Sequence, residues 1–302
     1  MRFLVVGAGA MGSLFAARLK RAGFKVTLLE KVQSLAQRIN EQGITVEGVS
    51  GQYHVRVPTF FDRPAEKPDV VLICVKSYDT RGVGDTLRSW LKPDTVILTL
   101  QNGLGNMEIL AEDFGNEKVL GGVTAEGATV LAPGRIRHAG QGETLIGASR
   151  ASEGIVSAFR EAGFETRAEV NVQGFIWGKL TINVGINALA AITRLKNGRL
   201  PELAGTRWVM EEAVREAAAV AAAKGICLPY ADPVGRVLEV CRATAGNIAS
   251  MLQDILRQQA TEIDFINGAI VREGRSLGIP TPVNLTLTSL VKVLQETHQE
   301  RV

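Results

Sequence analysis

The chain begins with a short apolar run followed by three glycines, and this stretch constrains the fold more than any other. The run ends at Val6 and continues as GAGAMG, which places Gly7, Gly9 and Gly12 between an expected strand and an expected helix. Gly7 permits a tight turn, Gly9 lets a pyrophosphate approach the backbone, and Gly12 lets the helix pack closely on the strand. The helix N-terminus then offers free N–H groups to the phosphates. We therefore predict a dinucleotide-binding unit, although a glycine-rich turn without a ligand has the same spacing.

The first half of the chain alternates short β-branched runs with helical stretches. The expected strands are Phe3–Val6, Lys25–Leu29, Val70–Val75, Thr95–Leu100 and Val119–Gly122. The expected helices are Met11–Ala22, Val32–Gln42, Thr80–Leu91, Asn106–Glu112 and Ser152–Ala162. Such alternation is typical of a parallel sheet with helices on both faces. We expect antiparallel strands within residues 127–147, with a turn at Pro133-Gly134, and a short strand near residues 165–168 to complete this domain.

The second half changes to one helix after another. The expected helices are Trp177–Ile192, Thr206–Lys224, Asp232–Gln259, Thr261–Leu277 and Thr281–Glu296, separated by glycine and proline signals. The predicted fold class is therefore α/β, with an N-terminal Rossmann-like dinucleotide-binding domain at residues 1–168. An all-α C-terminal domain is predicted at residues 169–302.

Length and composition narrow the functional classes. The 302 residues suffice for two domains, and a net charge of +3 without a long basic run argues against a nucleic-acid binder. The cysteines Cys74, Cys227 and Cys241 lack metal-ligand spacing, which favours a reduced, cytoplasmic protein without a bound metal. The N-terminus superficially resembles a signal peptide, but basic residues follow it at once. We expect no membrane association, because we identify no apolar run near the roughly 20 residues of a membrane span.

A row of polar residues interrupts an apolar helix in the second domain. Lys179, Asn183 and Asn187 recur every four residues within WGKLTINVGINAL. Such residues advance only about 40° around a helix, so they form one stripe. The stripe could simply face solvent, but it carries a single charge, and asparagine is a mediocre helix former. A cleft against the first domain would explain both features, with the lysine supplying a proton and the amides orienting a small polar ligand.

The motifs then point to a family. The chain resembles ketopantoate reductase (2-dehydropantoate 2-reductase) in six stretches in the right order: GAGAMG, CVKSYDT, QNGLGN, GGVTAEGA, WGKLTINVGINALAAI and SMLQDILRQQATEIDFINGAI. The resemblance implies that Lys179 is the general acid and that Glu262 belongs to the catalytic and cofactor-contacting set. The implied substrate-binding residues are Asn183, Asn187, Ser250 and Asn102. The implied cofactor-binding residues are Gly7, Ala8, Gly9, Ala10, Met11, Gly12, Lys31, Lys76, Asn102 and Glu262.

Each of these assignments has a simpler alternative in the sequence itself. Asn102 could belong to an ordinary Asn-Gly turn, and Lys76 could be a solvated lysine at a strand end. Ser250 could bond to the local backbone, and Glu262 could be a surface carboxylate. If the resemblance holds, Ser250 could donate to the substrate carboxylate, while Glu262 could accept from its hydroxyl or hold Lys179.

The resemblance implies NADPH-dependent reduction of 2-dehydropantoate to (R)-pantoate, on the route to pantothenate and coenzyme A. A protonated lysine beside the ketone oxygen would stabilise the negative charge of the transition state and then supply the proton. One alternative is an NAD(P)-dependent reductase of another branched 2-keto acid. A second alternative is a non-catalytic protein that senses the redox state of NADP(H). The sequence leaves the oligomeric state open, with a homodimer as one expectation.

Two local features carry separate expectations. We predict a break in the helix between Ser250 and Glu262, with Thr261 capping a new helix together with Asp264, because twelve helical residues span about 18 Å.

The second expected strand ends in Glu30 and Lys31. An acid at this point is typical of an NAD site, whereas a basic residue favours NADPH. We expect Glu30 to turn away and Lys31 to meet the 2′-phosphate of NADPH.

Overall fold

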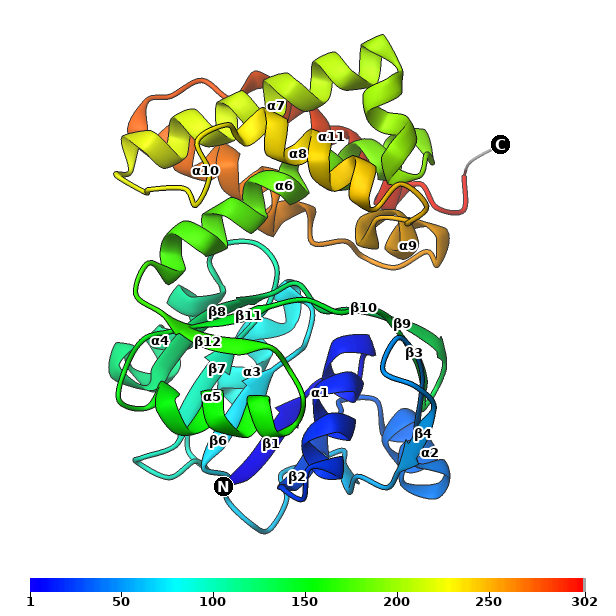
Figure 1. Ribbon diagram of the computed structural model, residues 1–302, viewed down its shortest axis with the longest axis vertical. Helices are drawn as coiled ribbons and strands as arrows, with labels where there is room; N and C mark the ends of the chain where they lie inside the picture. The colour runs from blue at the N-terminus through cyan, green and yellow to red at the C-terminus, as the bar shows by residue number, and fades with distance from the viewer. Residues whose placement is uncertain (301–302) are drawn as a thin grey trace. The chain divides into compact units, whose positions relative to one another are not determined.

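The computed structural model describes residues 1–300, which divide into two compact units (Figure 1). Unit 1 comprises Met1–Gln101 and Asn106–Val172, drawn from blue to green. Unit 2 comprises Asn102–Gly105 and the chain from Gln173 onward, drawn mainly from green to red. The mixed α/β class with a helical C-terminal region is therefore confirmed. The short excursion of residues 102–105 into unit 2 was not expected from the sequence.

Unit 1 is built on an eight-stranded sheet with the order β12-β11-β8-β7-β6-β1-β2-β5. Its strands are β1 (Arg2–Val6), β2 (Lys25–Leu29), β5 (Thr59–Phe60), β6 (Val70–Ile73), β7 (Val96–Thr99), β8 (Val119–Thr124), β11 (Thr144–Gly147) and β12 (Thr166–Glu169). All neighbours are parallel except β8 and β11, which are antiparallel. Because β1 lies between β2 and β6, the loop that follows β1 is flanked by the segments that follow those two strands.

Helices cover both faces of this sheet, as the alternating pattern predicted. The helices are α1 (Ala10–Arg21), α2 (Gln33–Gln42), α3 (Thr80–Leu87), α4 (Asn106–Phe114) and α5 (Ser152–Glu161). Along β1, Phe3 and Val5 join a core with residues of α1 and α5, while Leu4 and Val6 join a core with residues of α3 and α4. Successive residues of a strand point to opposite faces, so a strand buried on both sides is apolar throughout.

A second sheet in unit 1 was only partly predicted. Its order is β4-β3-β10-β9, formed by β3 (Ile44–Gly48), β4 (Tyr53–Val55), β9 (Gly127–Ala132) and β10 (Arg135–Gly140). The antiparallel pair β9–β10 turns at Pro133-Gly134, where Gly134 has a φ of 72°. The expected antiparallel pairing is confirmed for β9–β10, and β11 is antiparallel to β8, but β10 also pairs in parallel with β3 and β11 joins the larger sheet. Strands β3, β4 and β5 were missed.

Unit 2 is helical throughout its described part. Its helices are α6 (Val172–Thr193), α7 (Ala204–Ala223), α8 (Pro233–Ala243), α9 (Ser250–Leu256), α10 (Asn267–Leu277) and α11 (Pro282–Glu296), with short 3-10 segments η3 (Asn197–Glu202) and η4 (Ile263–Phe265). Helix α6 contributes many residues to the core of unit 2, and Gly185 lets α7 and α8 approach it closely. A Cβ at Gly185 would lie 2.8 Å from Val214 and 3.0 Å from Val237.

Helix α6 corrects the expectation that the chain has no apolar segment near the length of a membrane span. It has 22 residues and an 18-residue window with a mean hydropathy of 1.4, so by length and composition it could cross a bilayer. However, 67% of that window is buried inside the protein. A helix that is apolar nearly all round also suits a helical core, and many residues of α6 are buried in the core of unit 2.

The expectation of one continuous helix over residues 232–259 is wrong. Helix α8 ends at Ala243, and α9 begins only at Ser250. The backbone between them bonds to the start of η3: Asn197 N–H donates to the carbonyl of Asn247 at 3.1 Å, and Gly198 N–H donates to that of Ala245 at 3.2 Å. These carbonyls therefore serve a tertiary contact between distant segments, which a local helical pattern does not reveal.

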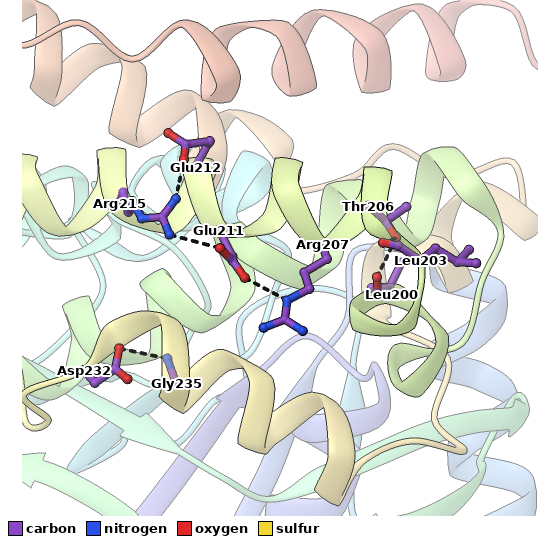
Figure 2. A network of polar contacts seen from close by, with 9 residues as sticks. All are labelled: Leu200, Leu203, Thr206, Arg207, Glu211, Glu212, Arg215, Asp232 and Gly235. Carbon is purple, nitrogen blue, oxygen red and sulfur yellow. Dashed lines mark hydrogen bonds and ion pairs between the residues drawn. The ribbon is translucent and has the colours of Figure 1, made fainter.

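Polar contacts on α7 and at the start of α8 mark the solvent-facing side of these helices (Figure 2). Glu211 accepts from Arg207 at 2.9 Å and from Arg215 at 3.0 Å, both at helical spacing. Asp232 caps α8, because its carboxylate accepts the N–H of Gly235 at 2.9 Å. Exposed ion pairs of this kind contribute about 0.3–0.5 kcal/mol each, so the stability of unit 2 comes mainly from its apolar core.

Candidate functional site

The glycine-rich loop of unit 1 has the geometry that a dinucleotide requires. Gly7 adopts a φ of 98°, which favours glycine. A Cβ at Gly12 would lie only 1.9 Å from the carbonyl oxygen of Gly7, whereas a Cβ at Gly9 would meet nothing within 4 Å. Position 12 therefore needs glycine for close packing of α1 on the loop, and the backbone at Gly9 is open to a ligand. Together with the N-terminus of α1, this arrangement fits a pyrophosphate.

The two charged residues after β2 take different positions. Glu30 is buried, and its carboxylate accepts the N–H of Ala8 at 2.9 Å and the N–H of Val32 at 3.0 Å. Lys31 is exposed, and its ammonium pairs with Asp79 at 2.7 Å. The two adjacent side chains therefore take different directions: the Glu30 carboxylate points inward to the glycine-rich loop, and the Lys31 side chain is exposed. The loop itself provides the reason, because the N–H of Ala8 attracts the carboxylate inward.

Lys76 lies just after β6, beside a network of hydrogen bonds that joins the ends of β6 and β7. Gln101 Nε2 donates to the carbonyl of Val75 at 2.8 Å and to Thr80 Oγ1 at 2.9 Å. Thr80 Oγ1 in turn donates to Asn106 Oδ1 at 2.9 Å. The network fixes the backbone on both sides of Lys76, at the edge of the sheet where ligands bind in open α/β folds.

The polar row on α6 is only partly accessible to solvent. Lys179 and Asn183 are half-buried, and Asn187 is buried. Burial lowers the pKa of Lys179 to about 8, because an ammonium loses hydration there, and the negative charge of Glu262 raises that pKa in opposition. A simple solvent-facing stripe does not account for a lysine in this environment. An amine with a pKa near neutrality is suited to donating a proton in a reaction.

Glu262 comes from a segment far from α6 in sequence, and the structure brings its charge within range of Lys179. The predicted break between Ser250 and Glu262 is confirmed, because α9 ends at Leu256 and Gln258 has a φ of 55°. Glu262 is buried, whereas Ser250 is exposed at the first position of α9. Because α9 ends before Glu262, the axis of α9 does not fix the position of Glu262.

The predicted capping of a new helix by Thr261 and Asp264 is wrong. Thr261 Oγ1 accepts the N–H of Ile263 at 3.3 Å, but the segment that follows is the 3-10 turn η4. The N–H of Thr261 donates to Gln295 at 2.6 Å, and Asp264 pairs with Lys292 at 2.7 Å. Both partners lie on α11, so a tertiary contact replaces the local cap.

Asn102 belongs to the short segment that groups with unit 2. The N–H of Leu104 donates to the carbonyl of Phe265 at 2.9 Å. Gly103 has a φ of 85°, and a Cβ there would lie 2.3 Å from the same carbonyl oxygen. This turn therefore needs glycine both for its backbone conformation and for its contact with η4. The contact places Asn102 next to the segment that carries Glu262.

Sequence patterns did not reveal a tyrosine that contacts α6 next to Lys179. Tyr230 donates to the carbonyl of Gly178 at 2.6 Å, and burial raises the pKa of its hydroxyl to about 12. A Cβ at Gly178 would lie 2.9 Å from Pro229, so a glycine permits this approach. The only signal in the sequence is Gly178 itself, immediately before Lys179.

Possible metal ligands do not form a site in the part of the chain that the structure describes. Over residues 1–300, no three His, Cys, Asp or Glu side chains are grouped to hold a metal ion. His138 is buried and its Nε2 lies 2.5 Å from Glu126 Oε2, which makes a structural pair in unit 1. Cys74, Cys227 and Cys241 are not joined in disulfides.

Comparison with known proteins shows similarity over the whole chain. The family model for ketopantoate reductase PanE/ApbA matches residues 3–151, and the model for its C-terminal part matches residues 171–295. The chain is 37% identical to a 2-dehydropantoate 2-reductase of Halobacterium salinarum, covering 98% of this chain and 99% of that protein. A 2-dehydropantoate 2-reductase of Pyrococcus horikoshii is 34% identical, with 97% of each chain covered.

Solved structures agree with these matches. The fold is similar to a PanE/ApbA family ketopantoate reductase from Ralstonia eutropha, with a TM-score of 0.93, 34% identity, and coverage of 99% of this chain and 100% of that chain. It is also similar to a ternary structure of D-mandelate dehydrogenase with NADH and anilino(oxo)acetate, with a TM-score of 0.91, 27% identity and 99% of each chain covered.

Proposed function

The chain belongs to the ketopantoate reductase family, and from that premise we propose that it reduces 2-dehydropantoate to (R)-pantoate with NADPH. The observation that carries the proposal is the environment of Lys179. Burial brings the pKa of this lysine to about 8 on an otherwise apolar helix, and Glu262 opposes that shift. Removing an ammonium from water costs free energy, so a lysine held in this environment indicates a chemical role.

Lys179 acts as the general acid. A nicotinamide cofactor, when bound, would supply the hydride for the ketone carbon. Negative charge then develops on the ketone oxygen, and the ammonium of Lys179 stabilises it and donates the proton that completes the alcohol. Glu262 helps to keep Lys179 protonated, because its negative charge raises the pKa of the amine. The amine regains its proton from solvent before the next turnover.

The remaining polar residues orient the keto acid. Asn183 and Asn187 follow Lys179 on the same stripe of α6, so their amides can bond to oxygens of a substrate held near the acid. The exposed hydroxyl of Ser250 is suited to the substrate carboxylate, and Asn102 supplies a further amide next to the Glu262 segment. Glu262 can in addition accept from the primary hydroxyl of the substrate.

Unit 1 supplies the features that bind the cofactor. The open backbone at Gly9 and the N-terminus of α1 fit the pyrophosphate, and Lys76 follows β6 at the same edge of the sheet. For the choice of NADPH, Lys31 is exposed after β2 and offers an ammonium to the 2′-phosphate. Glu30 already accepts two backbone N–H groups, so part of its hydrogen-bonding capacity is used within the protein.

The test is the rate of NADPH oxidation by the purified protein with and without 2-dehydropantoate, repeated with NADH and with a panel of branched and aromatic 2-keto acids. We expect the highest kcat/KM with 2-dehydropantoate and NADPH. We expect Lys31→Ala to raise KM for NADPH and to leave NADH almost unaffected. Oxidation without dependence on a keto acid would contradict the reductase assignment. A higher kcat/KM for NADH in the unaltered enzyme would make Glu30 the residue that selects the cofactor.

A second candidate substrate class has support from one comparison. The similarity to D-mandelate dehydrogenase extends over the whole chain, and the ligands in that structure are NADH and an aryl-substituted oxo acid. A reductase of an aromatic 2-keto acid would use the same Lys179 and the same polar row. In the panel above, benzoylformate turnover exceeding that of 2-dehydropantoate would favour this alternative.

A further inference from the structure

The ion pair between Lys31 and Asp79 joins two segments on either side of the glycine-rich loop. Lys31 follows β2 and Asp79 follows β6, whereas β1 lies between these two strands. Two strand spacings correspond to roughly 10 Å, and the 2.7 Å contact between the ammonium and the carboxylate closes this distance. The pair therefore lies beside the C-terminal end of β1, where the loop Gly7–Gly12 begins.

Asp79 lies at a position where an aspartate would normally cap the helix that follows it. It precedes α3 at the N-cap position, a position at which Asp is strongly preferred because its carboxylate accepts N–H groups of the first turn. In this structure its side chain makes no such capping bond. The carboxylate instead reaches Lys31, 48 residues away in sequence. The side chain of Asp79 is 29% exposed and that of Lys31 is 67% exposed, so a ligand can reach both.

We propose that Asp79 is a specificity-determining residue that weakens the preference of Lys31 for a 2′-phosphorylated cofactor. The inference rests on the proposed role of Lys31 toward the 2′-phosphate. A 2′-phosphate carries a charge of about −1.5 to −2 and competes with the Asp79 carboxylate for the same ammonium. A 2′-hydroxyl carries no charge and does not compete. Asp79 thus lowers affinity for NADPH selectively and brings the two cofactors closer in affinity.

The charges around Lys31 explain why a single substitution should have a measurable effect. Lys31 is flanked by Glu30, its neighbour in sequence, and by Asp79, its ion-pair partner. These three side chains, two carboxylates and one ammonium, together carry a net negative charge. Replacing Asp79 with asparagine keeps the shape of the side chain, removes one of the two negative charges and releases the ammonium for an incoming phosphate.

The experiment measures binding directly, without turnover. Dissociation constants for adenosine 2′,5′-bisphosphate and for 5′-AMP are determined by calorimetry for the unaltered protein, Asp79→Asn, Lys31→Ala and the double variant. Asp85→Asn is the matched control, because it removes the same charge from an exposed position on α3. We expect Asp79→Asn to strengthen binding of the bisphosphate about threefold or more, as expected for one exposed charge pair, with 5′-AMP and the Asp85 control unchanged.

The double variant decides whether Asp79 acts through Lys31. We expect the gain from Asp79→Asn to fall to less than half when Lys31 is alanine. Unchanged bisphosphate affinity in Asp79→Asn would overturn the inference, and a normal loss in Lys31→Ala would then leave the proposed cofactor assignment intact. If Lys31→Ala itself causes no loss, both the cofactor assignment and the inference fail. A gain that persists fully without Lys31 would also overturn the inference.

Discussion

Burial and the opposing charge of Glu262 together determine the pH range over which Lys179 could act as the proposed acid, and Glu262→Gln tests the contribution of Glu262. If Lys179 is the proposed general acid, activity requires the ammonium, so it is present below the pKa of Lys179 and lost as pH rises through it. With a pKa of about 8, half of the lysine is protonated at pH 8. An opposite charge at close range shifts a pKa by about 1–3 units. Loss of even one unit lowers the protonated fraction at pH 8 to about one tenth.

The assay is the pH dependence of kcat/KM for 2-dehydropantoate at saturating NADPH, which reports the pKa of the enzyme before the keto acid binds. We expect the midpoint on the basic side to move from about 8 to about 7 or below in Glu262→Gln. Asp264→Asn is the control, since it removes a carboxylate from the same segment that pairs with Lys292. An unmoved midpoint in Glu262→Gln, or an equal movement in the control, would refute the reasoning.

Three further substitutions test separate parts of the structure. Lys179→Ala should lower kcat by about 10²–10⁴-fold with NADPH affinity nearly intact, and a variant that keeps more than half of the original kcat would remove Lys179 from the mechanism. Gly12→Ala places a Cβ 1.9 Å from the Gly7 carbonyl oxygen, so we expect at least about tenfold weaker NADPH binding by fluorescence titration; unchanged affinity would show that the loop adapts. Asn284→Leu leaves the carboxylate of Glu216, which accepts from Asn284 at 2.7 Å, and the amide of Asn267 without this partner. The free energy of unfolding in urea should fall by about 1–3 kcal/mol, and an unchanged midpoint would argue against this network.

The parts of the fold that follow local periodicity could be predicted from the sequence. The predicted boundaries of the strands and helices around the glycine-rich loop agree with the observed ones to within a few residues, because each element has its own hydrophobic period and its own turn signal. The second sheet could not be predicted in this way, because β3 pairs with β10, which lies far along the chain. The division of residues 232–259 into two helices has the same cause, since η3 supplies the contacts that interrupt the helical backbone.

The candidate site shows the same limit at the level of side chains. The polar stripe of α6 was visible because one helix carries all three residues. The direction of the Glu30 side chain could not be predicted from the sequence, because the donor that orients it is the N–H of Ala8 in another loop. Asp79 would be expected to cap its own helix, and only the tertiary structure brings it to Lys31. Sequence reasoning thus identified residue types suited to the chemistry, while long-range contacts decide which of them meet.

Helix α6 also has a consequence for how the chain is made. The ribosome completes α6 at Thr193, whereas the helices that bury it begin at Ala204 and extend to Glu296. Until those helices emerge, the nascent chain presents an apolar segment long enough to attract chaperones or the membrane-insertion machinery. A chain truncated soon after α6 should therefore aggregate or be degraded instead of persisting as a free N-terminal domain. The helix that carries Lys179 therefore depends for its burial on helices that are synthesised after it.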